Sequence, residues 1–173
     1  MANEKILITG SSGVLGSALL KVLTNTPYQV IPFPHTIADI RNFQHIKKTL
    51  EKVRPQCVIH LAALTDVDYC EKNPTIAYDV NTFATNYLAD ICNRSDIKMV
   101  FMSTGAVFDG KKKSPYDEND NPNPINIYGK SKFLAENEVR RLPNALIIRT
   151  GWLIGSFVDD KKFVGLIVNQ LKL

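Results

Sequence analysis

The segment Tyr128-Gly-Lys-Ser-Lys132 carries a phenol and an amine four residues apart. In an α-helix this spacing brings the two side chains to one face, about a turn apart. A phenol, with a pKa of about 10, is a weak acid at neutral pH. An ammonium group at about 4 Å stabilises its phenolate form, which brings proton transfer into range. The pair therefore predicts general acid catalysis by Tyr128, although so short a motif also occurs on ordinary surface helices.

A glycine-rich segment near the N-terminus has the composition of a diphosphate-binding turn. We expect Gly10 to permit a tight turn off a strand, Gly13 to let the backbone approach a pyrophosphate, and Gly16 to allow close helix–sheet packing. Backbone amides at the helix N-terminus would then face the anion. The expected cofactor-binding residues are Gly10, Ser11, Ser12, Gly13, Val14, Leu15 and Gly16.

The spacing of these glycines is not the commonest one for dinucleotide binding. Two residues separate each glycine from the next, whereas the common fingerprint has a single residue in the first gap. An ordinary glycine-rich turn is therefore an alternative.

The end of the second apolar run, Gln29–Phe33, bears on which nicotinamide cofactor is preferred. A carboxylate at this place bonds the ribose hydroxyls of NAD. Here the sequence reads Pro34-His35-Thr36, without an acid. A 2′-phosphate would meet no repulsion there, which favours NADP(H) and leaves NAD(H) open. Asp39 and Ile40 are candidates to contact the adenine, and the alternative is that they belong to a helix N-cap.

Two further hydroxyl groups, on Ser103 and Thr104, close the apolar run that begins at Met99. In open α/β sheets, ligands bind at the carboxyl ends of the strands. Thr104 and Tyr128 together would offer two donors to the oxygen of a substrate carbonyl. The alternative for Thr104 is a hydroxyl that only satisfies a turn.

The elements that must position these groups alternate along the chain. Apolar β-rich runs predict strands at residues 5–9, 29–33, 57–61, 99–103 and 145–149. Amphipathic patterns predict helices after residue 13 and over 43–53, 75–93, 128–142 and 163–173. Among the connections between these elements are a loop at 62–73 and a long polar segment at 105–126. A connection as long as the second is typical of functional loops. Pro32 predicts an irregular end to the second strand.

No hairpin signal separates consecutive strands. The sequence therefore predicts an α/β fold with a single domain, a Rossmann-type doubly wound parallel sheet with helices on both faces.

Composition excludes several classes of function. With 173 residues, 45% hydrophobic and 22% charged, the chain can bury one core. The net charge of +4 includes the run Lys111–Lys113 without interleaved aromatic residues, so we expect no nucleic-acid binding. Three dispersed cysteines and three dispersed histidines predict no metal site and a reducing, cytoplasmic location. We expect no signal peptide and no membrane span.

Taken together, the motifs resemble those of the extended short-chain dehydrogenases/reductases, and within them the dTDP-4-dehydrorhamnose reductase family. The matching stretches are Ile6–Gly16, His60–Ala63, Thr65–Asp68, Ala77–Asn81, Ser103–Thr104, Val107–Gly110, Asn123–Lys132 and Arg149–Trp152. The resemblance implies an NAD(P)H-dependent reductase of the C4 keto group of dTDP-4-dehydro-L-rhamnose or a related nucleotide sugar. An epimerase or dehydratase of the same superfamily and a non-catalytic, NAD(P)-binding regulatory subunit are the alternatives.

The resemblance implies roles for the matching residues. Tyr128 would protonate the C4 carbonyl oxygen, and Lys132 would hold the nicotinamide ribose and lower the pKa of the tyrosine. Thr104 would orient the carbonyl, with Ser103 beside it. The cofactor cleft would be bordered by Leu61, Ala62 and Ala63, with Asn81 as a cofactor-site residue that supports this wall from the long helix. The sugar pocket would be bordered by Thr65, Val67 and Trp152.

Two features depart from the family. Gly105-Ala106 stands where its members have Asp-Tyr, which removes a hydroxyl and a ring from the sugar pocket. Family members also continue well past residue 173. We therefore expect residues 1–173 to form the NAD(P)-binding Rossmann domain, with the C-terminal substrate-binding part largely absent, and a homodimer as the assembly.

Overall fold

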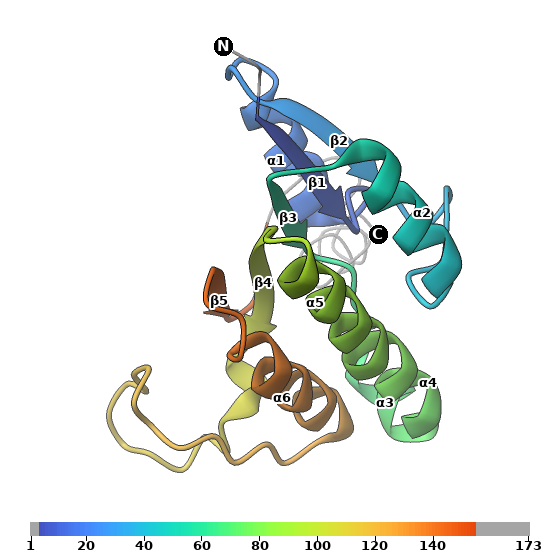
Figure 1. Ribbon diagram of the computed structural model, residues 1–173. Helices are drawn as coiled ribbons and strands as arrows, with labels where there is room; N and C mark the ends of the chain where they lie inside the picture. The colour runs from blue at the N-terminus through green and yellow to red at the C-terminus, as the bar shows by residue number, and fades with distance from the viewer. Residues whose placement is uncertain (1–3, 155–173) are drawn as a thin grey trace, which may run out of the picture.

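The computed structural model describes residues 4–154 (Figure 1). The strands are β1 Lys5–Thr9, β2 Gln29–Phe33, β3 Cys57–His60, β4 Lys98–Thr104 and β5 Ala145–Thr150. They form one sheet in the order β2-β1-β3-β4-β5, and each neighbouring pair is parallel. The predicted α/β class and parallel sheet are confirmed.

The helices are α1 Val14–Leu23, α2 Phe43–Val53, α3 Val67–Lys72, α4 Pro74–Tyr78, α5 Ala84–Arg94 and α6 Ile127–Val139. A π-helical turn, η1 (Asp79–Phe83), joins α4 to α5, and a 3₁₀ turn, η2 (Gly105–Val107), follows β4. The helix predicted over 75–93 is thus the continuous path α4-η1-α5. The helix predicted over 163–173 lies outside the described residues.

Three sequence predictions need correction. The loop predicted over 62–73 contains α3, which starts where the carboxylate of Asp66 accepts a hydrogen bond from the amide of Tyr69. The helix predicted over 128–142 ends at Val139. The irregular end predicted for the second strand is absent, since Pro32 pairs with Ile8 in the regular register of β1 and β2. Because β2 is an edge strand of the described sheet, the missing N–H of Pro32 costs no ladder bond on its open side.

Helices cover both faces of the sheet, as predicted. In Figure 1, α1 lies on one face, while α2, α5 and α6 lie on the other and contact one another in that order. Between these three helices and the sheet lies the main hydrophobic core. Its buried side chains include Leu7, Val58, Met99 and Phe101 of the strands and Ile46, Leu50, Leu88 and Val139 of the helices.

The strand order reverses beside β1, and this reversal sets the place of the site. The connection from β1 leads to β2 on one side, whereas β3, β4 and β5 follow on the other. Loops leaving β1 and β3 therefore diverge at their carboxyl ends, where open α/β sheets bind ligands. At their start the two loops are still in close contact, since a Cβ added to Gly10 would lie 2.6 Å from the amide nitrogen of Ala62.

Candidate active site

A cleft of about 1020 Å³ opens at the carboxyl ends of the strands. It is lined by the segments that follow β1, β2, β3 and β4, by α6, and by residues 150–154. The predicted site residues that line it are Gly10, Ser12, Gly13, Val14, Leu15, Gly16, Asp39, Ile40, Leu61, Ala62, Ala63, Thr65, Val67, Ser103, Thr104, Tyr128, Lys132 and Trp152. The structure thus gathers in one cleft residues from across the sequence.

Two predicted cofactor-binding residues do not line the cleft. Ser11 is buried beneath the turn, where an added Cβ on Gly16 would approach its Cα to 2.6 Å. Asn81 is fully buried, and its side-chain amide accepts from the nitrogen of Leu64 at 2.8 Å and donates to the oxygen of Leu64 at 3.0 Å. Asn81 therefore holds the wall after β3 from behind, as the resemblance implied, without facing the cleft.

The turn after β1 exposes backbone to the cleft. Gly10 has φ +65°, a left-handed conformation that costs a residue with a side chain about 1–2 kcal/mol. Gly13 is the N-cap of α1 and offers no side-chain cap, so the first amides of the helix lack intrahelical partners. These amides, at Val14, Leu15 and Gly16, belong to residues that line the cleft. The turn has the form of an anion site.

In the segment between β2 and α2, Asp39 is held by Arg41. The carboxylate accepts from Arg41 Nε at 3.0 and 3.1 Å, from Nη2 at 2.5 Å and from the backbone amide at 2.8 Å. The hydrogen bond from the Arg41 side chain is the main reason why the pKa of Asp39 falls to about 2. His35 Nε2 lies 3.8 Å from the same carboxylate. The alternative that Asp39 caps a helix is wrong, because the N-cap of α2 is Asn42.

Thr104 and Tyr128 meet where β4 ends and α6 begins. Asn126 caps α6 by accepting from the amide of Gly129 at 2.7 Å. A Cβ on Gly129 would collide with the carbonyl oxygen of Ala106, so only glycine lets α6 approach η2 so closely. Tyr128 and Thr104 are hydrogen-bonded to one another, and the Thr104 hydroxyl also accepts from the amide of Ala106 at 3.1 Å.

The pKa of Tyr128 is set mainly by burial. Burial raises the pKa of the phenol, and the hydrogen bond with Thr104 lowers it only in part. The groups that shift this pKa do not include Lys132, whose Nζ lies 4.1 Å from the ring centroid of Phe101, so its expected effect on Tyr128 stays a prediction. Tyr128 is consequently a phenol that keeps its proton at neutral pH.

The amine of Lys132 is buried. Its side chain is 2% exposed, and burial lowers its pKa to about 7, opposed by the carboxylate of Glu136. His60 lies nearby, with its ring bonded to Thr9 at 2.7 Å and to Thr85 at 2.9 Å. Burial, together with repulsion from Lys132, lowers the pKa of His60 to about 3, so this ring is neutral.

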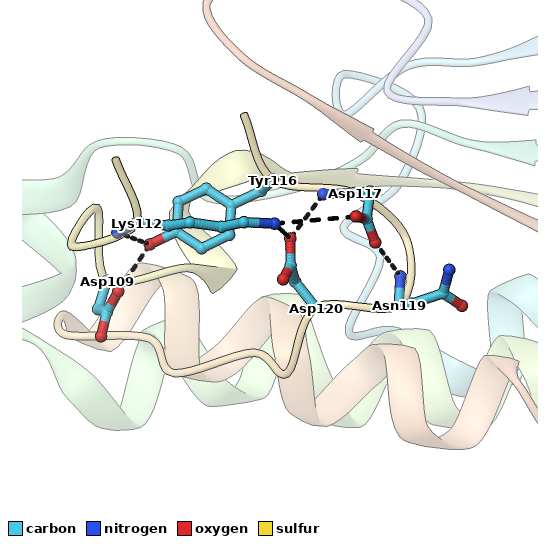
Figure 2. Close-up of polar contacts among 6 residues, drawn as sticks. All are labelled: Asp109, Lys112, Tyr116, Asp117, Asn119 and Asp120. Atoms are coloured by element: carbon cyan, nitrogen blue, oxygen red, sulfur yellow. Dashed lines mark hydrogen bonds and ion pairs between the residues drawn. The ribbon is translucent and has the colours of Figure 1, made fainter. Parts of the chain in front are cut away.

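The long polar segment after η2 organises itself without lining the cleft (Figure 2). The Tyr116 hydroxyl donates to Asp109 at 2.7 Å, and Lys112 Nζ contacts Asp120 at 2.5 Å and Asp117 at 3.8 Å. The amide of Asn123 donates to the carbonyl of Val107 at 2.8 Å, which ties the segment back to η2. This segment therefore contributes to the site only by connecting η2 to the start of α6.

Sequence reasoning missed several side chains around the cleft. Arg41 lines it two residues after Asp39, and a guanidinium so close to an acid in sequence was the available signal. Glu136 and Arg149 lie behind it, where Arg149 Nη2 donates to Glu136 at 2.7 Å. No periodic pattern marks Glu136 as buried, because a charged residue in a helix is usually on the surface.

Two other kinds of feature are absent from residues 4–154. In that part of the chain, His, Cys, Asp and Glu side chains form no group of three or more suited to a metal ion. Nor does any helix there have the length and apolar character needed to cross a bilayer.

Comparison with known proteins adds independent findings. The family model described as the RmlD substrate binding domain matches residues 4–172. The chain is 36% identical over 169 residues to the "Probable low-salt glycan biosynthesis reductase Agl14" of Haloferax volcanii, covering 91% of this chain and 56% of that protein. It is 31% identical over 160 residues to "Methionine adenosyltransferase 2 subunit beta" of Danio rerio, covering 88% and 49%.

A solved structure is also similar. The dTDP-4-dehydrorhamnose reductase of Bacillus anthracis, in complex with NADP, superposes with a TM-score of 0.92 at 36% identity, covering 99% of this chain and 61% of that one. The chain spans about half the length of the curated relatives it matches.

Proposed function

The chain belongs to the RmlD substrate binding domain family, and on that premise we propose that it is the dinucleotide-binding portion of an NADPH-dependent nucleotide-sugar reductase. The proposed substrate is dTDP-4-dehydro-L-rhamnose or a related NDP-4-ketosugar, reduced at C4. The observation that carries the proposal is the single cleft that joins the glycine turn to Thr104, Tyr128 and Lys132.

The residues present fit a nicotinamide dinucleotide. The turn from Gly10 to Gly16 exposes helix-end amides where a diphosphate would bind. An added Cβ at Gly10 would strike the loop after β3, so this turn keeps the narrow approach that the fold uses for dinucleotides. The chemistry that a bound reduced nicotinamide supplies is hydride transfer.

Arg41 and Asp39 support NADP(H) over NAD(H). With Asp39 neutralised by its ion pair, the cleft wall after β2 carries no net negative charge from this pair. Both residues line the cleft, beside His35. An arginine near the end of this strand is the feature that accommodates a 2′-phosphate.

Tyr128 is the proposed proton donor. Its raised pKa keeps the phenol protonated until negative charge develops on a substrate oxygen. Thr104, bonded to Tyr128 at the end of β4, would orient that oxygen as a second donor. Lys132 would place a positive charge on the floor of the same cleft.

The sugar would lie toward Thr65, Val67 and Trp152, which border the cleft. Gly105 and Ala106 line it too, so small residues replace a larger wall there. The substrate-binding part expected from the relatives' length would complete this pocket. The homodimer remains a prediction.

A binding titration and a turnover assay test the proposal together. Trp152, the sole tryptophan, lines the cleft, so its fluorescence should respond to NADPH and NADH. We expect saturable NADPH binding and NADPH oxidation with dTDP-4-dehydrorhamnose. Absence of binding contradicts the dinucleotide site. Tightly held oxidised cofactor in the purified protein would instead favour an epimerase or dehydratase.

A regulatory subunit is the second candidate. It is favoured by the similarity to "Methionine adenosyltransferase 2 subunit beta" of Danio rerio and by the small residues at 105–106. Binding of NADPH without turnover of any 4-ketosugar, in a chain extended to the relatives' full length, would support it over the reductase.

A further inference from the structure

A buried carboxylate, Glu136, lies behind the cleft and takes no part in the chemistry described so far. The residue is 0% exposed, and its oxygens accept from Ser103 Oγ at 2.5 Å, from Arg149 Nε at 3.0 Å and Nη2 at 2.7 Å, and from Arg140 Nη2 at 3.0 Å. Burial raises the pKa of this carboxyl, but the bonds from Arg149 and Ser103 outweigh burial and lower it overall. Glu136 is therefore ionised at neutral pH.

Glu136 lies on the same stripe of α6 as the proposed catalytic residues. Tyr128, Lys132 and Glu136 follow one another at intervals of four residues, which places them on one helix face. The first two line the cleft, and Glu136 continues the row beyond its inner end.

The partners of Glu136 come from two strands that also lead into the cleft. Ser103 and Arg149 face each other in the register of β4 and β5. Ser103 precedes Thr104, and Arg149 precedes the segment that carries Trp152. A single carboxylate thus fastens α6 to the ends of both strands.

The groups around Lys132 come from several elements. On its own helix these are the carboxylate of Glu136 and, one turn away in the other direction, the neutral phenol of Tyr128; from β3 comes the neutral ring of His60, and from β4 the ring of Phe101. Arg149 of β5 is paired with Glu136. Glu136, one helical turn from Lys132 on the same buried face of α6, raises the pKa of the Lys132 amine against the larger effect of burial.

We propose that Glu136, held by Arg149 and Ser103, is a positioning residue that fixes α6, and with it the Lys132 side chain, against β4 and β5. A contribution of Glu136 to catalysis depends on the proposed reductase function. The effect of Glu136 on Lys132 does not depend on that function, because it can be measured in the folded chain without cofactor or substrate.

The test is an NMR titration of the protein with ¹³C-labelled lysine, following the Cε shifts with pH. The Lys132→Arg protein identifies the Lys132 signal by its loss. In Glu136→Gln we expect the Lys132 midpoint to fall by about one pH unit or more, a tenfold change in its protonation constant. The matched control is Glu138→Gln, which removes an exposed carboxylate paired with Arg141 on the same helix and should leave the midpoint in place.

An unchanged Lys132 midpoint in Glu136→Gln, with the fold intact by circular dichroism, overturns the proposal. Should that variant fail to fold, Arg140→Ala provides the reverse test, since Arg140 is half exposed. Removing this cation leaves Glu136 less neutralised, so the Lys132 midpoint should rise. A midpoint that stays or falls contradicts the proposal. The titration uses neither cofactor nor sugar, so its failure and the failure of the reductase assay are separate outcomes.

Discussion

The two ends of the cleft present different kinds of chemical group. At the β1 end the groups that face the ligand are backbone amides, and the side chains there are small or apolar. At the β4 end the groups are side chains, with Tyr128 half-buried and Lys132 buried on α6, and with the ion pair of Glu136 and Arg149 behind them. The first end depends on backbone shape, whereas the second depends on charge compensation. Substitutions should therefore damage the two ends in different ways.

The largest effect is expected from Tyr128→Phe. Loss of the phenolic proton should reduce the rate of 4-ketosugar reduction by ~10² to 10⁴-fold, because the ring stays in place while the acid is lost. The affinity for NADPH, measured by Trp152 fluorescence, should stay within about twofold, since the other end of the cleft is untouched. A rate that survives unaltered would remove Tyr128 from the chemistry.

Gly10→Ala should break the other end. An alanine at φ +65° is strained, and its Cβ would crowd Ala62, so NADPH affinity should fall by at least about tenfold. Gly110→Ala is the matched control, because Gly110 has φ +73° but no atom within 4 Å of an added Cβ. The control should lose about 1 kcal/mol of unfolding free energy and keep its NADPH affinity. Equal losses of affinity in both variants would argue against a diphosphate site at Gly10.

The same contrast between the two ends of the cleft explains which parts of the fold and of the site could be predicted from the sequence. The glycine spacing after Thr9 and the strand runs are local signals, and they predicted the turn and every strand of the described sheet. Thr104, Tyr128 and Lys132 also lie in the predicted cleft. By contrast, α3 has only six residues, too few to show helical periodicity.

What sequence could not supply is the electrostatic setting. Lys132 and Glu136 look like ordinary helix-surface charges, and only the packing of α6 on β4 and β5 reveals that both are buried. The π-helical turn that carries Asn81 likewise follows from tertiary contacts, here the bonds from Asn81 to Leu64 and Ser131. The upward shift of the Tyr128 pKa also depends on burial, which the sequence does not reveal.

Lys132 predicts an unusual dependence of stability on pH. Its pKa is about 7 in the folded protein, below the ordinary value of 10.5. Between these values the unfolded chain binds more protons, so the contribution of Lys132 to stability rises with pH, by at most about 1.4 kcal/mol per unit. Urea unfolding from pH 7 to 10 should therefore show wild type gaining stability relative to Lys132→Met. A constant difference between the two proteins would mean that the ammonium is not buried.

The smallest effect on cofactor affinity is expected from a substitution of Arg41, an exposed residue at the edge of the cleft. Arg41 is 44% exposed, and Arg41→Gln should weaken NADPH binding by about fivefold while leaving NADH binding unchanged or improved. Asp39 without its partner would repel a 2′-phosphate, which gives the direction of the change. Lys47→Gln, which removes an exposed lysine paired with Glu51 on α2, is the control and should alter neither affinity. Parallel loss of NADPH and NADH affinity in Arg41→Gln would exclude a role in choosing between them.

If one dinucleotide spans both ends of this cleft, a crystal structure of the protein with NADP⁺ will show it. We expect the diphosphate on the amides of the turn from Gly10 to Gly16 and the nicotinamide ring beside the Tyr128 hydroxyl. A nicotinamide bound away from that hydroxyl, or a diphosphate bound elsewhere than the turn, would contradict this expectation.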